Sequence, residues 1–448
     1  MLLQRKAKEV FNIEPVGSEQ MLSWMDECVA MYKGNPCWVS EDNHIDSIVF
    51  AKAICSEVAR LVTLGIGIHV DGSVRAAWIQ EQLEKVYYQL RNWVEYGCAY
   101  GTVILKPNRG DIELYTPDEF EVTHSTDGKI DGVIFHNWEK VDKKWYTRLE
   151  YHRYEKKQYL ITNKCFWGNN PDDTKKEVDI KETPWTGMEE NVVLDNIEFP
   201  LFGVLKTPSA NNIDIGSPYG LPVFSEAVQE LRDLDIAYSR NAKEIFDSKR
   251  TVLLDSDRML PSTKNSKKEP VVLPDYIKLV DSSGALDSDI YHEINPELNT
   301  DTRLKGINSL LSQIGYKVGF SNGYFVFNES SGIQTATGVE AEQQRTIQFI
   351  KDMRDRLEKC LHDVIYGLNT MAELYGESSG GAYEIVFDFG DITYDREHDR
   401  AIWWGYVTAG KVPAWKFFVK FEGMTEEEAR AMVAEAAPKE PKLFGGEE

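Results

Sequence analysis

One stretch constrains the fold more than any other: residues 337–375 predict a single unbroken helix. Its apolar residues recur at helical spacing, namely Ile350, Met353, Leu357, Leu361, Val364, Leu368 and Tyr375. The opposite face carries charges in i,i+4 pairs such as Arg354–Glu358. Thr337 is predicted to be the N-cap, and Glu340 three residues later completes a capping box. Such a helix is more than ~50 Å long, so we expect it to cross a large domain or assembly.

The segment before this helix, residues 321–334, is polar, holds two glycines and shows no helical period. The first two turns of the helix are also polar and include Glu340 and Glu342. A flexible loop that feeds a polar helix start predicts that this end of the helix meets solvent or a polar partner.

Length and charge limit the possible functions. The chain has 448 residues and a formal net charge of −23, so it has room for two to four domains of roughly 100–200 residues each. Strong acidity disfavours tight binding of nucleic acid through phosphate neutralisation, and also docking on an anionic membrane. Six scattered cysteines without a CxxC pair predict reduced thiols. With no leader-like or membrane-spanning apolar run, we expect a soluble protein made in a reducing cytoplasm.

The first half of the chain predicts helices followed by a sheet. Helical patterns cover residues 18–33, 46–63 and 73–96, the second capped by Asp46, with a short strand at 66–70. From residue 101 to about residue 204 the pattern changes to period two and indicates antiparallel strands rich in Trp and Tyr. These aromatic residues suit a carbohydrate platform or simply half-buried strands, and we favour the second interpretation.

The second half predicts an antiparallel pair of helices with a small β insertion between them. The first helix runs from Leu221 to Asp247 and the second from Thr300 or Asp301 to Val318. Basic residues gather at the end of the first helix, where they complement its dipole or form a collar near a polyanion: Arg240, Lys243, Lys249 and Arg250. The strand-rich insertion carries one basic cluster, made of Lys264, Lys267 and Lys268, which is typical of a solvated loop. A strand at 383–389 and helices at 396–409 and 425–435 follow the long helix.

Signatures of catalysis and of cofactor binding are missing from the sequence. It has no GxxxxGK[ST], HExxH or GxSxG motif and no Cys/His set with metal-ligand spacing. The tripeptide at residues 388–390 copies the kinase DFG, but the glycine-rich loop and the His-Arg-Asp loop that should precede it are missing. We therefore expect no catalytic residue, no metal, no cofactor and no enzymatic activity.

The order of these parts resembles the portal proteins of tailed bacteriophages, in particular the family from phages of Gram-positive hosts. The best-matching stretch is GYKVGFSNGYFVFNESSGIQTATGVEAEQQRTI, residues 315–347. It resembles the family's loop followed by a helix that starts with TAT, and six residues fall on that pattern: Thr335, Ala336, Thr337, Val339, Glu342 and Thr346. Gly338 stands where the family commonly has an acidic residue. The helix at 46–63 leading into 97–107, and residues 216–222 entering a helix, also match.

The resemblance implies an α+β portal fold with an α/β wing, a two-helix stem, a small β-rich clip, a long wing-spanning helix and a helical crown. The implied limits are 1–217 for the wing, 218–250 and 300–319 for the stem helices, 251–299 for the clip, 320–336 for the tunnel loop, 337–392 for the long helix with its return strand, and 393–448 for the crown and tail.

The implied function is that of a ring, usually of twelve subunits, at one capsid vertex, through which double-stranded DNA is packaged and ejected. Implied partners are the terminase large subunit, the major capsid and scaffolding proteins, a head-completion adaptor, and DNA that passes non-specifically, with no membrane. The protein would be assembled in the cytoplasm of the bacterial host and reside in the virion. The alternatives are a carbohydrate-active hydrolase or another structural capsid or adaptor protein.

The resemblance also implies roles for particular residues. The tunnel loop would line the DNA channel with Tyr324, Phe325, Asn328, Glu329, Ser330 and Gln334. The start of the long helix would contribute Thr335, Thr337, Glu340 and Glu342. The clip would face the terminase with Lys264, Lys267 and Lys268, and the stem would carry the basic collar Arg240, Lys243, Lys249 and Arg250. The acidity of the chain would repel DNA along the channel and so keep it from adhering.

Overall fold

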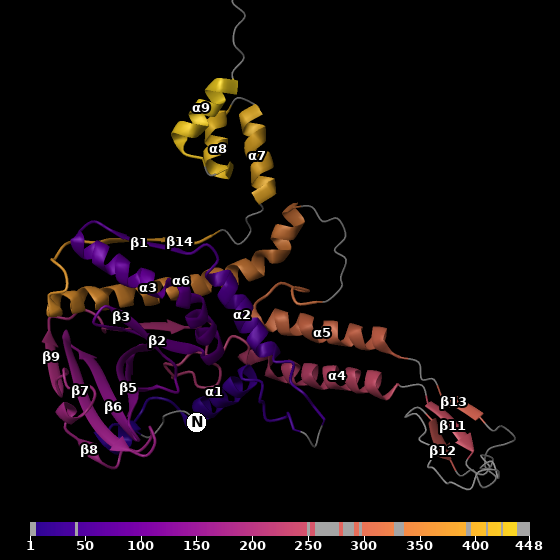
Figure 1. Ribbon diagram of the computed structural model, residues 1–448, viewed down its shortest axis with the longest axis horizontal. Helices are drawn as coiled ribbons and strands as arrows, with labels where there is room; N and C mark the ends of the chain where they lie inside the picture. The colour runs from indigo at the N-terminus through magenta and orange to yellow at the C-terminus, as the bar shows by residue number, and fades with distance from the viewer. Residues whose placement is uncertain are drawn as a thin grey trace, which may run out of the picture. The chain divides into compact units, whose positions relative to one another are not determined.

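The computed structural model describes residues 6–40, 44–248, 251–255, 277–280, 291–294, 298–326, 336–390, 396–408, 411–422 and 424–436. The chain divides into two compact units, residues 1–388 and 389–448. It is mixed α and β, as Figure 1 shows, so the predicted α+β class is confirmed.

The first unit holds most of the helices and all the strands described here. Its helical elements are η1 (Ala7–Phe11), α1 (Glu19–Tyr32), α2 (Phe50–Val62), α3 (Val74–Tyr100), η3 (Ile180–Glu182), η4 (Ser225–Ala227), α4 (Val228–Asp247), α5 (Thr300–Val318) and α6 (Ala336–Tyr375). Its strands are β1 (Gly67–Asp71), β2 (Thr102–Asn108), β3 (Asp111–Tyr115), β4 (Phe120–Thr126), β5 (Lys129–Val141), β6 (Lys144–Glu155), β7 (Gln158–Gly168), β8 (Glu177–Val178), β9 (Asn191–Asp195), β10 (Gly203–Lys206), β11 (Thr251–Asp255), β12 (Ile277–Val280), β13 (Tyr291–Ile294) and β14 (Glu384–Asp388).

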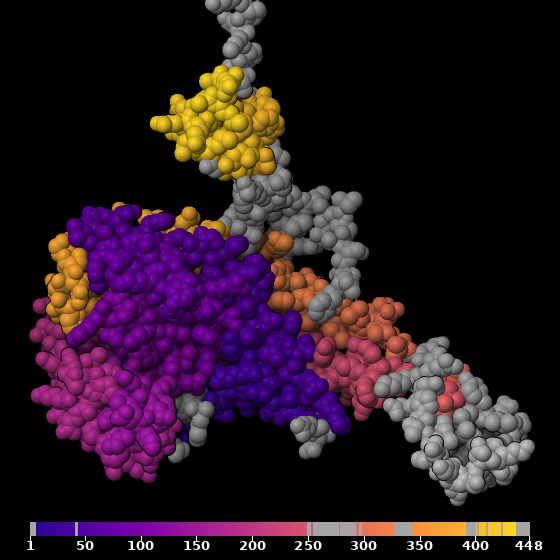
Figure 2. Space-filling view, in the orientation of Figure 1, coloured from indigo at the N-terminus to yellow at the C-terminus, as the bar shows by residue number. Residues whose placement is uncertain are grey.

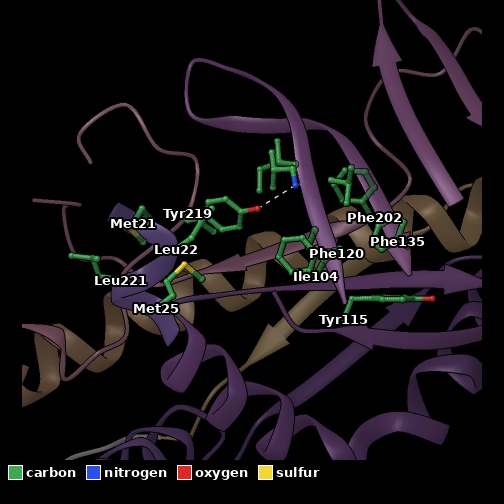
Figure 3. Packing of buried hydrophobic residues seen from close by; sticks show 13 residues of the cluster. Met21, Leu22, Met25, Ile104, Tyr115, Phe120, Phe135, Phe202, Tyr219 and Leu221 are labelled. Carbon is green, nitrogen blue, oxygen red and sulfur yellow. Dashed lines mark hydrogen bonds between the residues drawn. The ribbon is translucent and has the colours of Figure 1, made fainter. Parts of the chain in front are cut away.

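The predicted antiparallel region forms two sheets. The larger has the order β4-β5-β6-β7-β8, with β9 also paired to β7, and the smaller has the order β10-β2-β3. Between them lies a core of buried side chains that α1 closes from one side (Figure 3). Met21 and Met25 of α1 and Phe120 and Phe135 of the larger sheet belong to this core. The core therefore joins the N-terminal helix to both sheets.

The long helix α6 packs across the smaller sheet. Its predicted apolar face is confirmed from Ile350 to Leu368, where all six predicted residues are buried. A Cβ at Gly203 of β10 would lie 2.2 Å from the carbonyl oxygen of Cys360, so only glycine permits this close crossing. Tyr375 was wrongly assigned to the buried face: it is 51% exposed and its ring lies 4.8 Å from the guanidinium of Arg109.

Two further details of α6 differ from the prediction. The helix begins at Ala336, so Thr337 lies in its first turn and is not the N-cap, because alanine extends a helix at no propensity cost. Arg354, expected on the exposed charged face, is only 7% exposed. Its guanidinium donates to the carbonyl oxygens of Leu61 at 2.9 Å and of Val62 at 3.1 Å, so it satisfies the C-terminal end of α2.

Strands far apart in sequence form a two-stranded ribbon. β1 pairs antiparallel with β14, with Gly67 opposite Asp388. The other edge of β1 is bonded to side chains of α3: the Ile68 N–H donates to the hydroxyl of Tyr87 and the Val70 N–H to the side-chain oxygen of Gln80. The strand predicted at 66–70 and its return strand are thus both present, as Figure 1 shows.

Several predicted helix limits were wrong because buried contacts override local pattern. α2 begins at Phe50, since the Asp46 N–H bonds to Ser239 and the extended segment before α2 is held by α4. α4 begins at Val228, because Leu221 and Phe224 are core residues of the preceding turn. Asn299, and neither Thr300 nor Asp301, precedes the first residue of α5.

The second unit contains α7 (Arg396–Thr408), α8 (Ala414–Glu422) and α9 (Glu426–Ala436). Phe417 and Phe421 of α8 form its centre, with Trp403 and Trp404 of α7 edge-on against them. Thr425 and Glu428 exchange bonds at the start of α9 and form a capping box there. The helix α8 was not predicted. Across the described parts of both units, no helix is long and apolar enough to cross a membrane.

Candidate assembly surface

α4 and α5 form an antiparallel stalk. At the far end of α4, Glu244 accepts the backbone N–H of Asn299 at 3.1 Å and pairs with Arg303 of α5. At the near end, Lys317 Nζ of α5 lies 2.5 Å from the carboxylate of Glu230. The chain therefore leaves the end of α4 and returns at the start of α5, as Figure 1 shows. The antiparallel arrangement expected from the sequence is confirmed.

The inner half of the stalk is anchored in the first unit. Leu231 and Leu234 of α4 and Leu311 of α5 are buried. Asp235 of α4 accepts a bond from the indole N–H of Trp38 and another from the backbone N–H of Ile48, both at 3.0 Å. Burial raises the pKa of Asp235, although both bonds oppose this. This carboxylate thus ties the 38–48 segment to the base of the stalk.

The outer half of the stalk lacks a core of its own. No side chain is buried in the described segments 240–248 and 300–306. Large apolar side chains on α4 stay exposed: Tyr238 by 48%, Ile245 by 50% and Phe246 by 67%. Tyr238 and Ile245 are seven residues apart, so they lie on one side of the helix. We call these two residues the α4 stripe; Figure 2 shows the stalk, in pink and orange, at the surface of the molecule.

Three short strands lie between the stalk helices in sequence. β11 pairs parallel with β12 and antiparallel with β13. This agrees with the small β insertion that the sequence predicted. The basic cluster Lys264, Lys267 and Lys268, and the collar residues Lys249 and Arg250, lie outside the described residues. Arg240 and Lys243, the other two collar residues, are exposed on the outer half of α4.

The residues that follow α5 form an aromatic clamp at 320–326. Gly319 ends α5 with a φ of 113°, which favours glycine. Phe320 is fully buried, and its ring centroid lies 4.7 Å from that of Tyr324 and 4.8 Å from that of Phe325. The Ser321 N–H donates to the hydroxyl of Thr346 on α6 at 2.8 Å. The start of the predicted loop is therefore packed against α6.

The carboxylate of Glu57 on α2 also binds the clamp at 320–326. The Tyr324 hydroxyl donates to Glu57, and Arg60 donates to both oxygens of that carboxylate at 2.6 and 2.8 Å. Arg60 lowers the pKa of Glu57, whereas burial raises the pKa of Tyr324 to about 12. Glu57 is therefore ionised and Tyr324 neutral near pH 7, so the bond between them is charge-assisted.

The structure describes only part of the predicted channel residues. Tyr324 is 38% exposed and Phe325 is half-buried against Phe50, so both belong to the clamp, and Phe325 is turned into a packed cluster. Asn328, Glu329, Ser330, Gln334 and Thr335 lie outside the described residues. Thr337, Glu340 and Glu342 lie on the first two turns of α6, and the structure gives no description of their side chains.

Sequence reasoning missed a buried charge network between the sheets. Glu150 accepts bonds from Lys106 at 2.7 Å and from His152 at 2.8 Å, and Arg148 lies 3.1 Å from it. The side chains of Lys106, Arg148 and His152 are at most 3% exposed, and that of Glu150 is 11% exposed. Burial opposes ionisation, but Lys106 and Arg148 hold the pKa of Glu150 well below its usual range. These residue types occur in catalytic sites, yet their enclosure leaves a substrate no approach, and we interpret the network as structural.

Two tryptophans of the larger sheet, Trp145 and Trp167, have lysines over their rings. Lys140 lies 5.4 Å from the ring centroid of Trp145, and Lys144 and Lys176 lie 4.6 and 4.2 Å from that of Trp167. These rings therefore do not present bare faces for stacking on a sugar. Among the described residues, no group of three or more His, Cys, Asp or Glu is placed to hold a metal ion.

A scan of the sequence against models of protein families gives no match. A search of curated proteins also gives none.

Proposed function

We propose that the chain is the subunit of a portal, a ring at one capsid vertex of a tailed bacteriophage through which double-stranded DNA is packaged and ejected. The protein would conduct DNA passively, while a separate terminase supplies the force. Its other partners would be the capsid and scaffolding proteins and a head-completion adaptor, and it would reside in the virion. The support is the order of the parts: a two-helix stalk with a β insertion, the clamp at 320–326, and then α6.

The observation that carries the proposal is the α4 stripe. Exposed large apolar side chains on one side of the outer half of α4, such as Tyr238 and Ile245, favour an association, because burying one such side chain contributes about 1.5–3 kcal/mol. A second copy of the chain supplies the missing cover when stalks stand side by side. In the proposed ring, each stalk presents this stripe to a different face of its neighbour. Such a head-to-tail contact closes into a ring when the rotation between neighbours divides a full turn.

Charge is consistent with a channel for DNA. A net charge of −23 per subunit gives an assembled ring a strongly negative potential. A protein that held DNA by its phosphates would need the opposite sign and would not let the duplex slide freely through high-affinity contacts. The acidic ring would therefore repel the DNA phosphates and let the duplex slide through the channel.

Ring formation is tested by light scattering and negative-stain microscopy of the purified chain. We expect ring-shaped oligomers for the wild type. Ile245→Glu places a charge in the α4 stripe and should shift the protein to monomers or small oligomers. Val193→Glu introduces the same charge at a 55% exposed apolar residue of β9, outside the stalk, and serves as the control that keeps the rings. A wild-type monomer at all concentrations, or rings that Ile245→Glu leaves intact, would refute the proposal.

The DNA-handling role needs a separate test in a packaging assay. Replacing residues 327–334 with a Gly-Ser linker of equal length keeps the clamp at 320–326. We expect rings to assemble and DNA filling or retention to fall. Replacing Lys264, Lys267 and Lys268 with serine should weaken terminase docking and leave ring assembly unchanged. Normal DNA filling in the linker variant would remove the proposed role of this loop.

A further inference from the structure

The N-terminal turn η1 lies on one face of the larger sheet, far from the stalk in sequence. Ala7 is fully buried and packs with Ile134, Leu149 and Phe166 of the sheet. The ring centroid of Phe11, at the other end of the turn, lies 5.5 Å from that of Tyr151. The turn is therefore a short amphipathic plug on an apolar patch.

Polar contacts hold both ends of this plug. Lys6 donates to the carbonyl oxygen of Asp172 at 2.8 Å and to the hydroxyl of Thr174 at 2.9 Å. Lys164 of β7 donates to the carbonyl oxygen of Val10 at 3.2 Å.

Glu121 of β4 contacts the start of the turn. The Ala7 N–H donates to its Oε2 at 2.8 Å, but its Oε1 is buried without a hydrogen-bond partner. The residue is only 5% exposed. Burial raises the pKa of Glu121 from the usual 4.5 to about 7, against the lowering effect of the Ala7 bond. A carboxylate with one unpaired oxygen in such a place is costly when it is ionised.

The groups around Glu121 do not neutralise it. Lys6 favours its ionised form and Glu9, on the same turn, disfavours it. The hydroxyl of Tyr219, from the loop before α4, accepts the N–H of Val122. It stays protonated, because burial raises its pKa. On the neighbouring strand, burial lowers the pKa of His136 to about 4, so it is uncharged above pH 5. Glu121 is thus the group of this cluster that changes charge near neutrality.

We propose that the N-terminal turn is a pH-dependent latch, which docks on the sheet while Glu121 is protonated and is released when Glu121 loses its proton. Release exposes the carboxylate to water, where it is stable as an anion. The bond that breaks is the one from the Ala7 N–H, and the proton goes to solvent. The latch would set whether the patch beneath the turn is covered.

The direction of the effect follows from linkage. A carboxyl whose pKa is raised in the docked state stabilises docking fully below its free pKa of 4.5, and this contribution is lost as the pH rises through about 7. Between pH 5.5 and 8.5 the docking constant should fall by about 30-fold, and the fall should level off above about pH 7.

Hydrogen exchange of the full chain, followed by mass spectrometry on the peptide that covers residues 6–12, measures this docking. After correction for intrinsic exchange rates, we expect the protection factor to fall by about 30-fold over that range. Glu121→Gln retains an acceptor for the Ala7 N–H, and its protection factor should not change with pH. Glu14→Gln removes a charge from a residue just after the turn, whose side chain is 74% exposed, and should retain the wild-type pH dependence.

Two outcomes overturn the latch. One is a wild-type protection factor that stays constant between pH 5.5 and 8.5, a result that needs no variant. The other is a folded Glu121→Gln protein whose protection falls as steeply as that of the wild type. A wild-type decline that continues without levelling off above about pH 7 also counts against Glu121 as the titrating group.

Discussion

Replacing Glu150 with glutamine tests the buried charge network most directly. The change preserves size but removes the charge that lies 2.7 Å from Lys106 and 3.1 Å from Arg148. Each charge-assisted bond is worth about 1.5–3 kcal/mol, but such values do not add, and the amide oxygen keeps part of the bonding. Removing one partner of a buried ion pair costs about 3–5 kcal/mol, so we expect a loss of that size.

The assay is urea unfolding of both proteins at one fixed protein concentration, followed by tryptophan fluorescence. The pH dependence gives a second signature. Lys106 and Arg148 keep the pKa of Glu150 well below its usual range despite burial, so its contribution is present above about pH 4.5 and is lost as the pH falls through the lower, folded-state value. The difference between the two proteins should therefore be full at pH 7 and shrink in acid.

A loss below about 1 kcal/mol at pH 7 would refute this reasoning, because a buried pair broken on one side cannot be so cheap. A difference that does not change with pH would also refute it, since it would assign the loss to packing. Glu155→Gln, on the same strand with its side chain 58% exposed, is the matched control and should change stability by less than about 0.5 kcal/mol.

Three further changes probe the helices around α6. Arg354→Leu leaves the last carbonyls of α2 without their donor, and urea unfolding should show a loss of about 2–4 kcal/mol; a loss under about 1 would contradict the capping role. Gly203→Ala forces α6 away from β10 and should cost about 1–3 kcal/mol, whereas Gly187→Ala, with no atom within 4 Å, should leave the melting temperature unchanged. Tyr324→Phe should speed hydrogen exchange at 320–326 several-fold while rings persist. Unchanged exchange would show that the bond from Tyr324 to Glu57 of α2 does not stabilise this segment.

The hydrophobic pattern of the sequence predicted the buried residues correctly where a helix buries one face. The six apolar residues from Ile350 to Leu368 share one side of a helix, and that side is the buried one. The same pattern gave a wrong start for a helix where apolar residues belong to a packed turn before it. Leu221 and Phe224 have helical spacing with α4, but they fill the core before the helix begins at Val228.

The contacts at the candidate sites join residues that sequence cannot pair. The sequence predicts Arg354 as a surface charge, and only the structure shows that it donates to the carbonyl oxygens at the end of α2. The carboxylate of Glu121 meets a backbone N–H 114 residues away, and backbone donors leave no mark in a sequence. The α8 sequence AWKFFVKFE does carry a helical signal, because Lys416 and Lys420 are four residues apart and so are the buried Phe417 and Phe421, but at nine residues it is short for a helix. Tertiary packing decides the first two cases.

The β1–β14 ribbon has a consequence for biosynthesis. One edge of β1 is closed by Tyr87 and Gln80, so a single lateral position is open, and the strand that fills it ends at Asp388. A ribosome delivers residues in order, so β1 emerges early and waits until almost the whole first unit has been translated. We expect this unpaired edge to be a point where a chaperone engages the nascent chain, and ribosome profiling of chaperone occupancy would show whether that engagement ends once β14 has been translated.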